Sequence, residues 1–496
     1  MSETLKEKTA KGLFWGAMNN GVQQVLGIVF GIILGRLLVP EDFGLVAMIT
    51  VFSAVANALQ NSGFSTALIN EKEPKFVRSA SGHLHSTNYN AVFWFNIFMG
   101  LGIYAVLFFC APLIADYYHE PRLVWLSRYA FLSFVISSTG VAQAAYLYKH
   151  LRAKQLAKAN IFGVMLSSSV AVIMAWAGFS YWSIATQTNL FILISTILRW
   201  HYSEWRPSPL SRNTDFSFIR RVFPFSVKIL LSEVLTQVNV NVMNILLGRY
   251  FGSKSTGQYN QAYQWNFKCY SLVHNMLKQV DQAVLVSLSD ERERQLAVLR
   301  KMVRFAAFIA FPLMLGFGLV AKEFIVLAIG EIWLTSAGYI QILCVAGAVL
   351  PISTLLSDLI VSRGRSDIFL WCTLAMGACQ IAVLVLLHKM GYSIGDMVVA
   401  YVCIVLVWLF VWHFFVRRLT GYSLFLLLKD IVPFALAAFA VMAVTGWVTQ
   451  SIASLWLLLL CRVVIAAVLY YLVMRVCRVV ILDECIRFFF PKHHKQ

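Results

Sequence analysis

The sequence has little charge, and it lacks the residue patterns on which most soluble enzymes depend. Only 13% of its 496 residues are charged and 59% are hydrophobic, whereas soluble globular proteins average about 25% charged residues. The nine cysteines include no C-x-x-C pair, the histidines show no metal-ligand spacing, and no G-x-x-x-x-G-K-[ST] segment occurs. These absences exclude a soluble enzyme and argue against a metal site or an ATP-hydrolysing module on this chain.

The sequence consists largely of long apolar runs. A membrane-spanning helix needs about 20 mostly apolar residues, and fourteen runs of this kind occur, joined by connections too short for a large soluble domain. The runs lie at about residues 13–35, 43–69, 90–115, 123–147, 159–178, 181–199, 222–247, 258–287, 303–329, 336–361, 367–388, 393–416, 431–449 and 453–475. The sequence therefore predicts an all-α integral membrane protein with about 14 transmembrane helices.

The excess of positive charge predicts the orientation of these helices. The formal net charge is +18, which in a soluble chain would raise the question of nucleic-acid binding. In a membrane protein, Lys and Arg collect in cytoplasmic connections. With a cytoplasmic N-terminus, 30 of the 41 basic residues fall in segments expected inside and 7 in segments expected outside. We therefore expect both termini in the cytoplasm and no nucleic-acid partner.

A short motif recurs in the two parts of the chain. The L-G-R segment at residues 34–36 is followed by Gly44, and the L-G-R segment at 247–249 is followed, at the same spacing, by Gly257. Six spans separate the copies, so both have one orientation, as in transporters built from parallel repeats. The expected organisation is an N-terminal six-helix half at 1–199, a cytoplasmic linker at 200–221, a second six-helix half at 222–418, and helices 13–14 with a cytoplasmic tail at 419–496.

Polar side chains recur at helical spacing in four of the spans. Inside a membrane such groups are costly unless they face protein or water, so they mark a pathway. The candidate cavity residues are Asn20 and Gln24 in span 1; Asn57, Gln60 and Asn61 in span 2; Lys228, Glu233, Gln237, Asn241 and Asn244 in span 7; and Gln264, Lys268, Asn275 and Lys278 in span 8. The alternative is that the amides join helices by interhelical hydrogen bonds.

The cations inside the spans are the sharpest candidates for binding an anion. Lys268 lies about 15 Å from the outer end of its span at 1.5 Å per residue, near the midplane. Lys228 and Lys278 lie nearer the cytoplasmic face, where they could equally extend to the headgroups. Asp281 is three residues after Lys278 and could pair with it on one helix. Arg462 is expected to extend outward to the membrane surface.

Two segments carry a resemblance to a known family. The segment Leu34–Ala47, LGRLLVPEDFGLVA, with the GLFWG sequence at residues 12–16 before it, resembles the opening of polysaccharide flippases of the Wzx and WzxC type. These belong to the superfamily that also contains the lipid II flippase MurJ and the MATE exporters. The segment Leu246–Tyr263, LLGRYFGSKSTGQYNQAY, resembles the second-half counterpart. Fourteen spans fit these flippases, whereas MATE exporters have twelve.

The resemblance implies a function and a site. It implies flipping of an undecaprenyl-pyrophosphate-linked oligosaccharide from the inner to the outer leaflet of the bacterial inner membrane, by alternating access, for O-antigen, capsule or exopolysaccharide assembly. The partners implied are polysaccharide polymerases and glycosyltransferases. It also implies a cationic cavity lined by helices 1, 2, 7 and 8, to which Arg36 would contribute, and a groove for the lipid tail at helices 13 and 14.

Two other functions stay open at this point. One is a cation-coupled exporter of small amphiphiles, of the MATE type, and the other is a membrane glycosyltransferase or polysaccharide polymerase. The absence of a large outward loop and of a catalytic constellation favours a transporter over an enzyme. We expect no bound cofactor, and coupling to H⁺ or Na⁺ is left undecided.

Overall fold

The computed structural model describes residues 5–61, 68–69, 77–78, 84–210, 216–278, 281–288 and 291–489. Almost all of this part of the chain is helical. Within it, ten helices are long and apolar enough to cross a membrane, or eleven if one bent pair forms a single span. The prediction of an all-helical, multi-pass membrane protein is therefore confirmed, whereas the number of fourteen spans stays a prediction.

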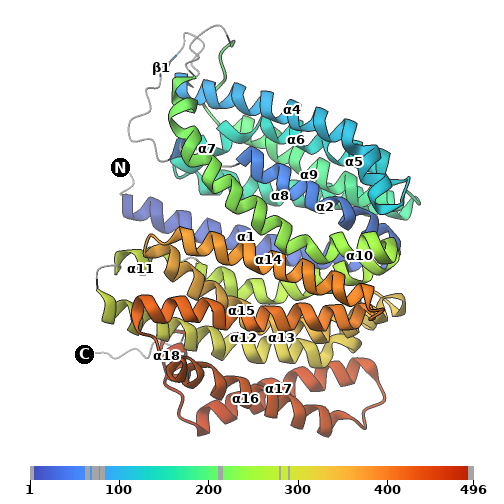
Figure 1. Ribbon diagram of the computed structural model, residues 1–496, viewed down its shortest axis with the longest axis vertical. Coiled ribbons are helices and arrows are strands. Elements are labelled where there is room, and N and C mark those ends of the chain that lie inside the picture. The colour runs from blue at the N-terminus through green and yellow to red at the C-terminus, as the bar shows by residue number, and fades with distance from the viewer. Residues whose placement is uncertain are drawn as a thin grey trace. The chain divides into compact units, whose positions relative to one another are not determined.

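The chain forms two compact units, Met1–Gly257 and Gln258–Gln496. The helices of the first unit are α1 (Leu5–Leu37), α2 (Pro40–Asn61), α4 (Thr87–Tyr118), α5 (Leu123–Ala130), α6 (Leu132–Ser138), α7 (Val141–Lys149), α8 (Ala153–Trp176), α9 (Tyr181–Tyr202) and the greater part of α10 (Ser217–Lys278) (Figure 1). The strands β1 (Val77–Arg78) and β2 (Leu84–His85) pair antiparallel.

The boundary between the units lies beyond the linker expected at residues 200–221. The beginning of that linker packs against the first unit, because Trp205 is fully buried and Trp94 Nε1 on α4 donates to the Ser208 carbonyl at 2.9 Å. Residues 211–215 lie outside the described part of the chain. The division into two six-helix halves with a linker stays a prediction.

The fourth predicted span, at residues 123–147, is broken into α5, α6 and α7, and its axis bends by 45° before α7. At the break, the Ser138 and Thr139 hydroxyls each donate to the carbonyl three residues earlier, at 2.7 Å, and Gly140 precedes α7. Hydroxyl-to-carbonyl bonds compete with the helical ladder and bend it. The predicted straight span is therefore three short helices.

The runs predicted as spans 7 and 8, at 222–247 and 258–287, are continuous in α10 except at one residue. Gly252 interrupts the helix with a φ of 77° and a ψ of −176°. Glycine adopts such a positive φ without the steric cost that a side chain imposes. The end of the second run forms the short helix α11 (Asp281–Ser287).

The start of α2 is fixed by the P-E-D-F-G segment. Pro40 occupies the first helical position, where the missing N–H costs nothing. The buried Asp42 carboxylate accepts the Val39 N–H at 3.2 Å and the Ser180 hydroxyl. Since Ser180 lies in the connection between α8 and α9, Asp42 ties the beginning of α2 to that turn.

The start of α2 and the stretch of α10 after the kink touch through their backbones. A Cβ on Gly44 would lie 1.8 Å from the Ser253 carbonyl oxygen. A Cβ on Gly257 would lie 1.7 Å from the Pro40 carbonyl oxygen. The contact is reciprocal, because each glycine meets the residue four before the other glycine. Only glycine fits at either position.

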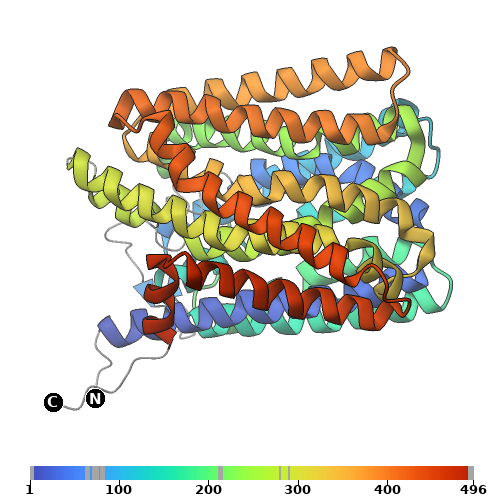
Figure 2. The same cartoon turned by 90° about the horizontal axis from the view of Figure 1, so that it is seen from below.

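The second unit contains the end of α10, α11, α12 (Arg292–Ala328), the 3₁₀ turn η1 (Glu331–Trp333), α13 (Leu334–Ser362), α14 (Ser366–Lys389), α15 (Ile394–Thr420), α16 (Leu424–Thr449), α17 (Leu455–Val476) and α18 (Val480–Phe489). The long helix α12 is central, since α13, α16 and α17 all pack on it. Figure 2 shows the short α18 turned across the end of α17. Arg475 and Asp483 form an ion pair across that turn at 2.7 Å.

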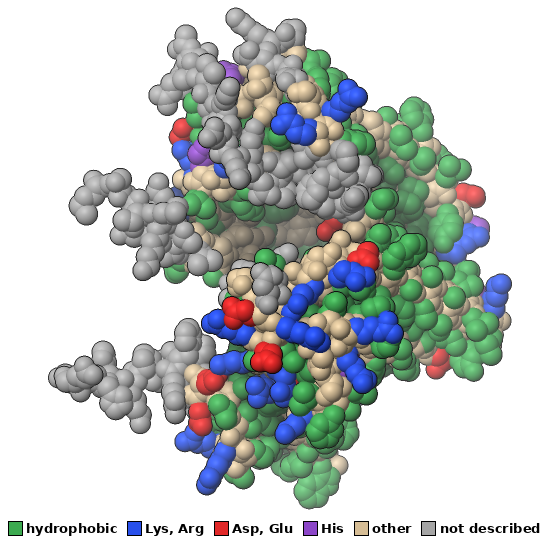
Figure 3. Space-filling model, turned by 60° about the vertical axis from the view of Figure 1, so that its left-hand side comes forward, with side chains coloured by type: hydrophobic (Ala, Val, Ile, Leu, Met, Phe, Trp, Pro, Cys, Tyr) green, Lys and Arg blue, Asp and Glu red, His purple; other side chains and the backbone are tan. Residues whose placement is uncertain are grey.

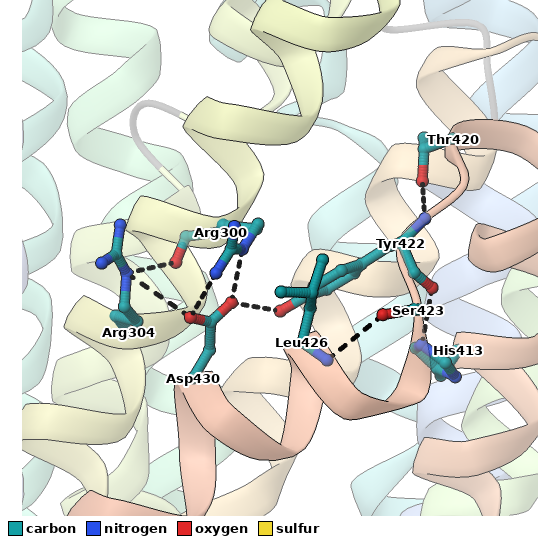
Figure 4. A network of polar contacts seen from close by, with 8 residues as sticks. All are labelled: Arg300, Arg304, His413, Thr420, Tyr422, Ser423, Leu426 and Asp430. Carbon is teal, nitrogen blue, oxygen red and sulfur yellow. Dashed lines mark hydrogen bonds and ion pairs between the residues drawn. The ribbon is translucent and has the colours of Figure 1, made fainter.

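A buried carboxylate fastens α16 to α12 (Figure 4). Asp430 accepts two hydrogen bonds from Arg300, at 2.8 and 3.0 Å. It also accepts the Tyr422 hydroxyl at 2.8 Å, and the Tyr422 carbonyl lies 3.0 Å from His413 Nε2 on α15. The Asp430 side chain is only 3% exposed. A bidentate pair of this kind fixes geometry as well as charge, so this network sets the position of α16 on the bundle.

We predict that Gly44→Ala and Gly257→Ala each lower the stability of the purified protein by about 1–3 kcal/mol, the usual cost of overpacking. The added Cβ meets a main-chain carbonyl, which cannot rotate away. Thermal unfolding in detergent, followed by size-exclusion chromatography with fluorescence detection, measures the effect. Gly102→Ala on α4 is the matched control, because nothing lies within 4 Å of its new Cβ. Equal melting of the Gly44 and Gly102 variants would contradict the contact.

We predict that Asp430→Asn destabilises the protein by about 1–3 kcal/mol, because it removes charge-assisted hydrogen bonds to Arg300. Asp367→Asn is the control, since its pair with Arg365 is more than half exposed on both sides and exposed pairs contribute about 0–1 kcal/mol. Thermal unfolding of the two variants compares them directly. A larger loss for Asp367→Asn than for Asp430→Asn would be inconsistent with the buried network.

Candidate functional site

The predicted cavity residues fall in both units, so their convergence on one cavity stays a prediction and each unit is considered by itself. In the first unit, α1 presents Asn20 and Arg36 as exposed side chains and Gln24 as half-buried. On the same helix, Gln23 Nε2 donates to Asn19 Oδ1 at 2.9 Å. These polar groups therefore follow one helix over several turns.

The second polar stripe of the first unit lies on α10. It passes from an exposed Glu233, through a half-buried Gln237, to a buried Asn241 and Asn244. Asn241 Nδ2 donates to the Gln237 carbonyl of its own helix at 2.9 Å. The Asn244 Oδ1 is buried and finds no hydrogen-bond partner within the described part of the chain. This hydrogen bond of Asn241 lies within one helix. The alternative in which the amides join neighbouring helices predicts a bond between helices instead.

On α2, the half-buried Asn57 lines a small pocket within the first unit. The side chains of Gln60 and Asn61 on α2, and of Lys228 on α10, lie outside the described residues. The structure thus places one of the three predicted polar side chains of α2.

In the second unit, Lys268 lies half-buried on α10. Its Nζ lies 4.1 Å from the centre of the Trp265 ring, one helical turn before it. A cation over an aromatic face is attracted to the ring by up to about 2 kcal/mol when desolvated. Gln264 and Asn275, on the same helix, are exposed. The ammonium group therefore has a defined position beside other polar side chains of α10.

Lys278 has a partner on another helix. Its Nζ lies 2.6 Å from Asp358 Oδ2 on α13, and the Asp358 side chain is 16% exposed. The side chain of Asp281, the partner considered from the sequence, lies outside the described residues. Asp358 therefore compensates the charge of Lys278.

Arg462 has partners on two neighbouring helices. Its Nη1 lies 2.9 Å from Glu323 on α12 and also donates to the Leu319 carbonyl at 3.0 Å. Its Nε lies 3.2 Å from the Thr449 hydroxyl of α16. Counting residues along α17 could not identify Glu323, which lies far away in the sequence. That Arg462 extends to the membrane surface stays a prediction.

A pocket of about 530 Å³ lies beside this ion pair in the second unit. It is bounded by α10, α12, α16 and α17, and apart from Arg462 its lining is almost wholly apolar, with residues such as Phe308, Pro312, Met442 and Tyr470. Apolar pockets with a few placed polar groups are usual ligand sites. Its apolar lining suits a hydrocarbon segment rather than a sugar chain.

Sequence reasoning missed an aromatic row beside the polar residues of α10. Tyr259 stacks on Tyr263 with ring centres 6.2 Å apart, and Tyr263 on Phe267 at 6.5 Å. Phe267 then meets Tyr270 edge-on at 5.3 Å. The spacing of four residues was visible in the sequence and repeats that of the polar side chains. Tyr259 is buried, whereas Phe267, the neighbour of Lys268 in the sequence, is exposed.

Comparisons with known proteins agree with this architecture. A family model described as "Polysaccharide biosynthesis protein" matches residues 33–338. An "Uncharacterized membrane protein in cps region" of Klebsiella pneumoniae is 26% identical over 74% of this chain and 73% of its own length. The "Lipopolysaccharide biosynthesis protein WzxC" of Escherichia coli is 24% identical over 74% of this chain and 72% of its own.

The fold is that of a known transporter group. The lipid II flippase MurJ, solved in an inward closed conformation, superposes with a TM-score of 0.69, covering 93% of this chain and 99% of that one at 13% identity. At that identity the likeness establishes the fold alone. The family model covers well over half of the chain, and this protein therefore belongs to the polysaccharide biosynthesis protein family.

Proposed function

We propose that this protein is a flippase for lipid-linked oligosaccharides. Undecaprenyl-pyrophosphate-linked repeat units would pass from the inner to the outer leaflet of the bacterial inner membrane by alternating access, for O-antigen, capsule or exopolysaccharide assembly. The observation that carries the proposal is a polysaccharide biosynthesis family match on a fold shared with a lipid-linked precursor flippase. The intramembrane polar residues of α1, α2 and α10 support a path for a sugar head group.

In this proposal Lys268 binds the pyrophosphate. Its fixed position over Trp265 and the neighbouring exposed Gln264 support that role, because an ammonium is a compact charge suited to phosphate. The exposed Phe267 of the aromatic row offers a face for a sugar ring. Coupling to H⁺ or Na⁺ is not part of the proposal.

The lipid tail is assigned to the apolar pocket of the second unit. Its lining by α12, α16 and α17 supports the expected role for the last two long helices. The Arg462–Glu323 pair gives the pocket one polar edge, and a buried, hydrogen-bonded pair of this kind can persist in an apolar setting. An isoprenoid chain would then occupy surface that is otherwise left uncovered.

The topology is a proposal as well, with both termini cytoplasmic. It is supported by the gathering of Lys and Arg on the end of the second unit where α12 begins and α17 ends, as Figure 3 shows. Arg292, Arg294 and Lys301 are exposed there, and Lys301 pairs with Glu484 of α18 at 2.8 Å. Basic residues are retained on the cytoplasmic side of membranes.

We predict that alkaline phosphatase fused after Asn213 is inactive in cells, because the connection before α10 is expected in the cytoplasm. The same enzyme fused after Gly391, between α14 and α15, is expected to be active in the periplasm. Enzyme activity normalised to the amount of fusion protein measures both. The reverse pattern would overturn the proposed orientation.

We predict that Lys268→Ala lowers surface polysaccharide at least about tenfold, the loss expected when a charge-assisted bond to a phosphate is removed. The measurement is surface polysaccharide in a strain that depends on this protein, with membrane abundance checked by immunoblot. Lys322→Ala, an exposed lysine of α12, is the control and should leave the amount unchanged.

Unchanged polysaccharide in the Lys268→Ala strain at normal abundance would reject the assigned role of Lys268. Deletion of the protein tests the function itself, because loss of a flippase traps lipid-linked units inside the cell. Single repeat units on the cell surface would instead indicate a polymerase, and loss of drug resistance with unchanged polysaccharide would indicate an exporter of small amphiphiles.

A further inference from the structure

A second pocket lies wholly inside the first unit, between α2, α6, α7 and α9. Its volume is about 280 Å³, at the lower end of the range of ligand sites, which is about 300–1,000 Å³. The polar side chains that line it are Asn57, Ser137, Tyr148, Ser195, Thr196 and Arg199. A pocket of this size admits a phosphate or about one sugar unit.

Arg199 is the charged group of this pocket. It lies in the last turn of α9, where the sequence places it among the basic residues expected at the cytoplasmic surface. Its Nη2 donates to Asn160 Oδ1 of α8 at 3.2 Å. Its Nε is buried and has no hydrogen-bond partner among the residues that the structure describes. The guanidinium therefore has one donor satisfied by the protein and another left for a ligand.

Hydroxyl groups stand next to this donor on the same helix. Ser195 lies one turn before Arg199, is 2% exposed and lines the pocket. Its Oγ also lacks a partner in the described part of the chain. Thr196, 5% exposed, adds a second hydroxyl to the lining. A buried polar atom left unsatisfied costs about 1–3 kcal/mol, so two such atoms at one pocket indicate a missing acceptor.

Two other arginines show how a guanidinium in this protein is satisfied by a carboxylate. Arg462 and Arg300 each contact a carboxylate of a neighbouring helix. Arg199 makes no ion pair with any carboxylate among the described residues. A ligand that carries the negative charge would take the place of such a carboxylate at Arg199. The guanidinium presents a planar set of donors that matches an oxyanion.

We propose that this pocket binds an oxyanion, the phosphate or the sugar carboxylate of an anionic head group, with Arg199 Nε and the Ser195 hydroxyl as donors. Asn57, a predicted cavity residue of α2, lies on the pocket lining and would contact the rest of the head group. That the oxyanion belongs to the transported molecule rests on the proposed function. The binding itself does not.

Binding to the full-length protein in nanodiscs tests the proposal with two probes, inorganic phosphate and glucuronate. Isothermal titration calorimetry measures the affinity for each. The wild-type protein is expected to bind at least one probe, and Arg199→Gln to weaken that binding at least about tenfold, as for loss of a charged hydrogen bond. Arg128→Gln on α5 is the control, because that guanidinium lies over the Phe108 and Trp125 rings, and it should bind like the wild type.

Ser195→Ala keeps the test decisive if the Arg199 variant fails to fold, because it removes only one oxygen. It should weaken binding by about threefold to tenfold, with the melting temperature of the unliganded protein unchanged. Binding of phosphate alone assigns the site to a phosphate group, and binding of glucuronate alone assigns it to an acidic sugar. Either result supports the oxyanion site. No binding of either probe to the wild type, or equal affinities of wild type and both pocket variants, would overturn it.

These measurements need no transport. A failure of the proposed flippase function therefore leaves the binding result readable, and a failure of binding at Arg199 leaves the Lys268 experiment unaffected.

Discussion

The structure depends on one constraint, which is that a polar group inside a membrane must find a partner or face water. Backbone N–H and C=O groups satisfy this constraint through the hydrogen bonds of the helices. Charged side chains satisfy it by forming ion pairs between different helices, such as Arg462 with Glu323 and Lys278 with Asp358. Where the constraint is met by the protein, the group holds helices together. Arg199 Nε finds no partner within the described part of the chain, and the proposed oxyanion would satisfy it.

Much of the fold could be predicted from the sequence, because apolar runs of about 20 residues have few alternatives to a helix in a membrane. Each predicted run overlaps one or more helices. The departures occur at single residues. Hydroxyls and a glycine at 138–140 break one run into short helices, and Gly252 interrupts α10 between two others. Periodicity does not report these effects, since they depend on single residues.

The site was less predictable. Polar spacing identified the helices that carry Asn241 and Lys268, because helical geometry alone places such residues on one face. It could not identify partners from other helices, so Arg462 was assigned to the membrane surface and Asp358 was not considered. It also treated Arg199 as an orientation signal, because a basic residue at the end of a span is usually that. Only the packing of α8 and α9 places its guanidinium in a pocket.

The backbone contact at Gly44 and Gly257 has a consequence for divergence among related chains. It consists of main-chain atoms, so no exchange of side chains elsewhere in the protein alters it. Under the proposed function, residues that line the path of a sugar can therefore change with the sugar that is carried, while the crossing of α2 and α10 keeps its geometry. Specificity for the sugar can in this way vary without a change in the place where α2 and α10 meet.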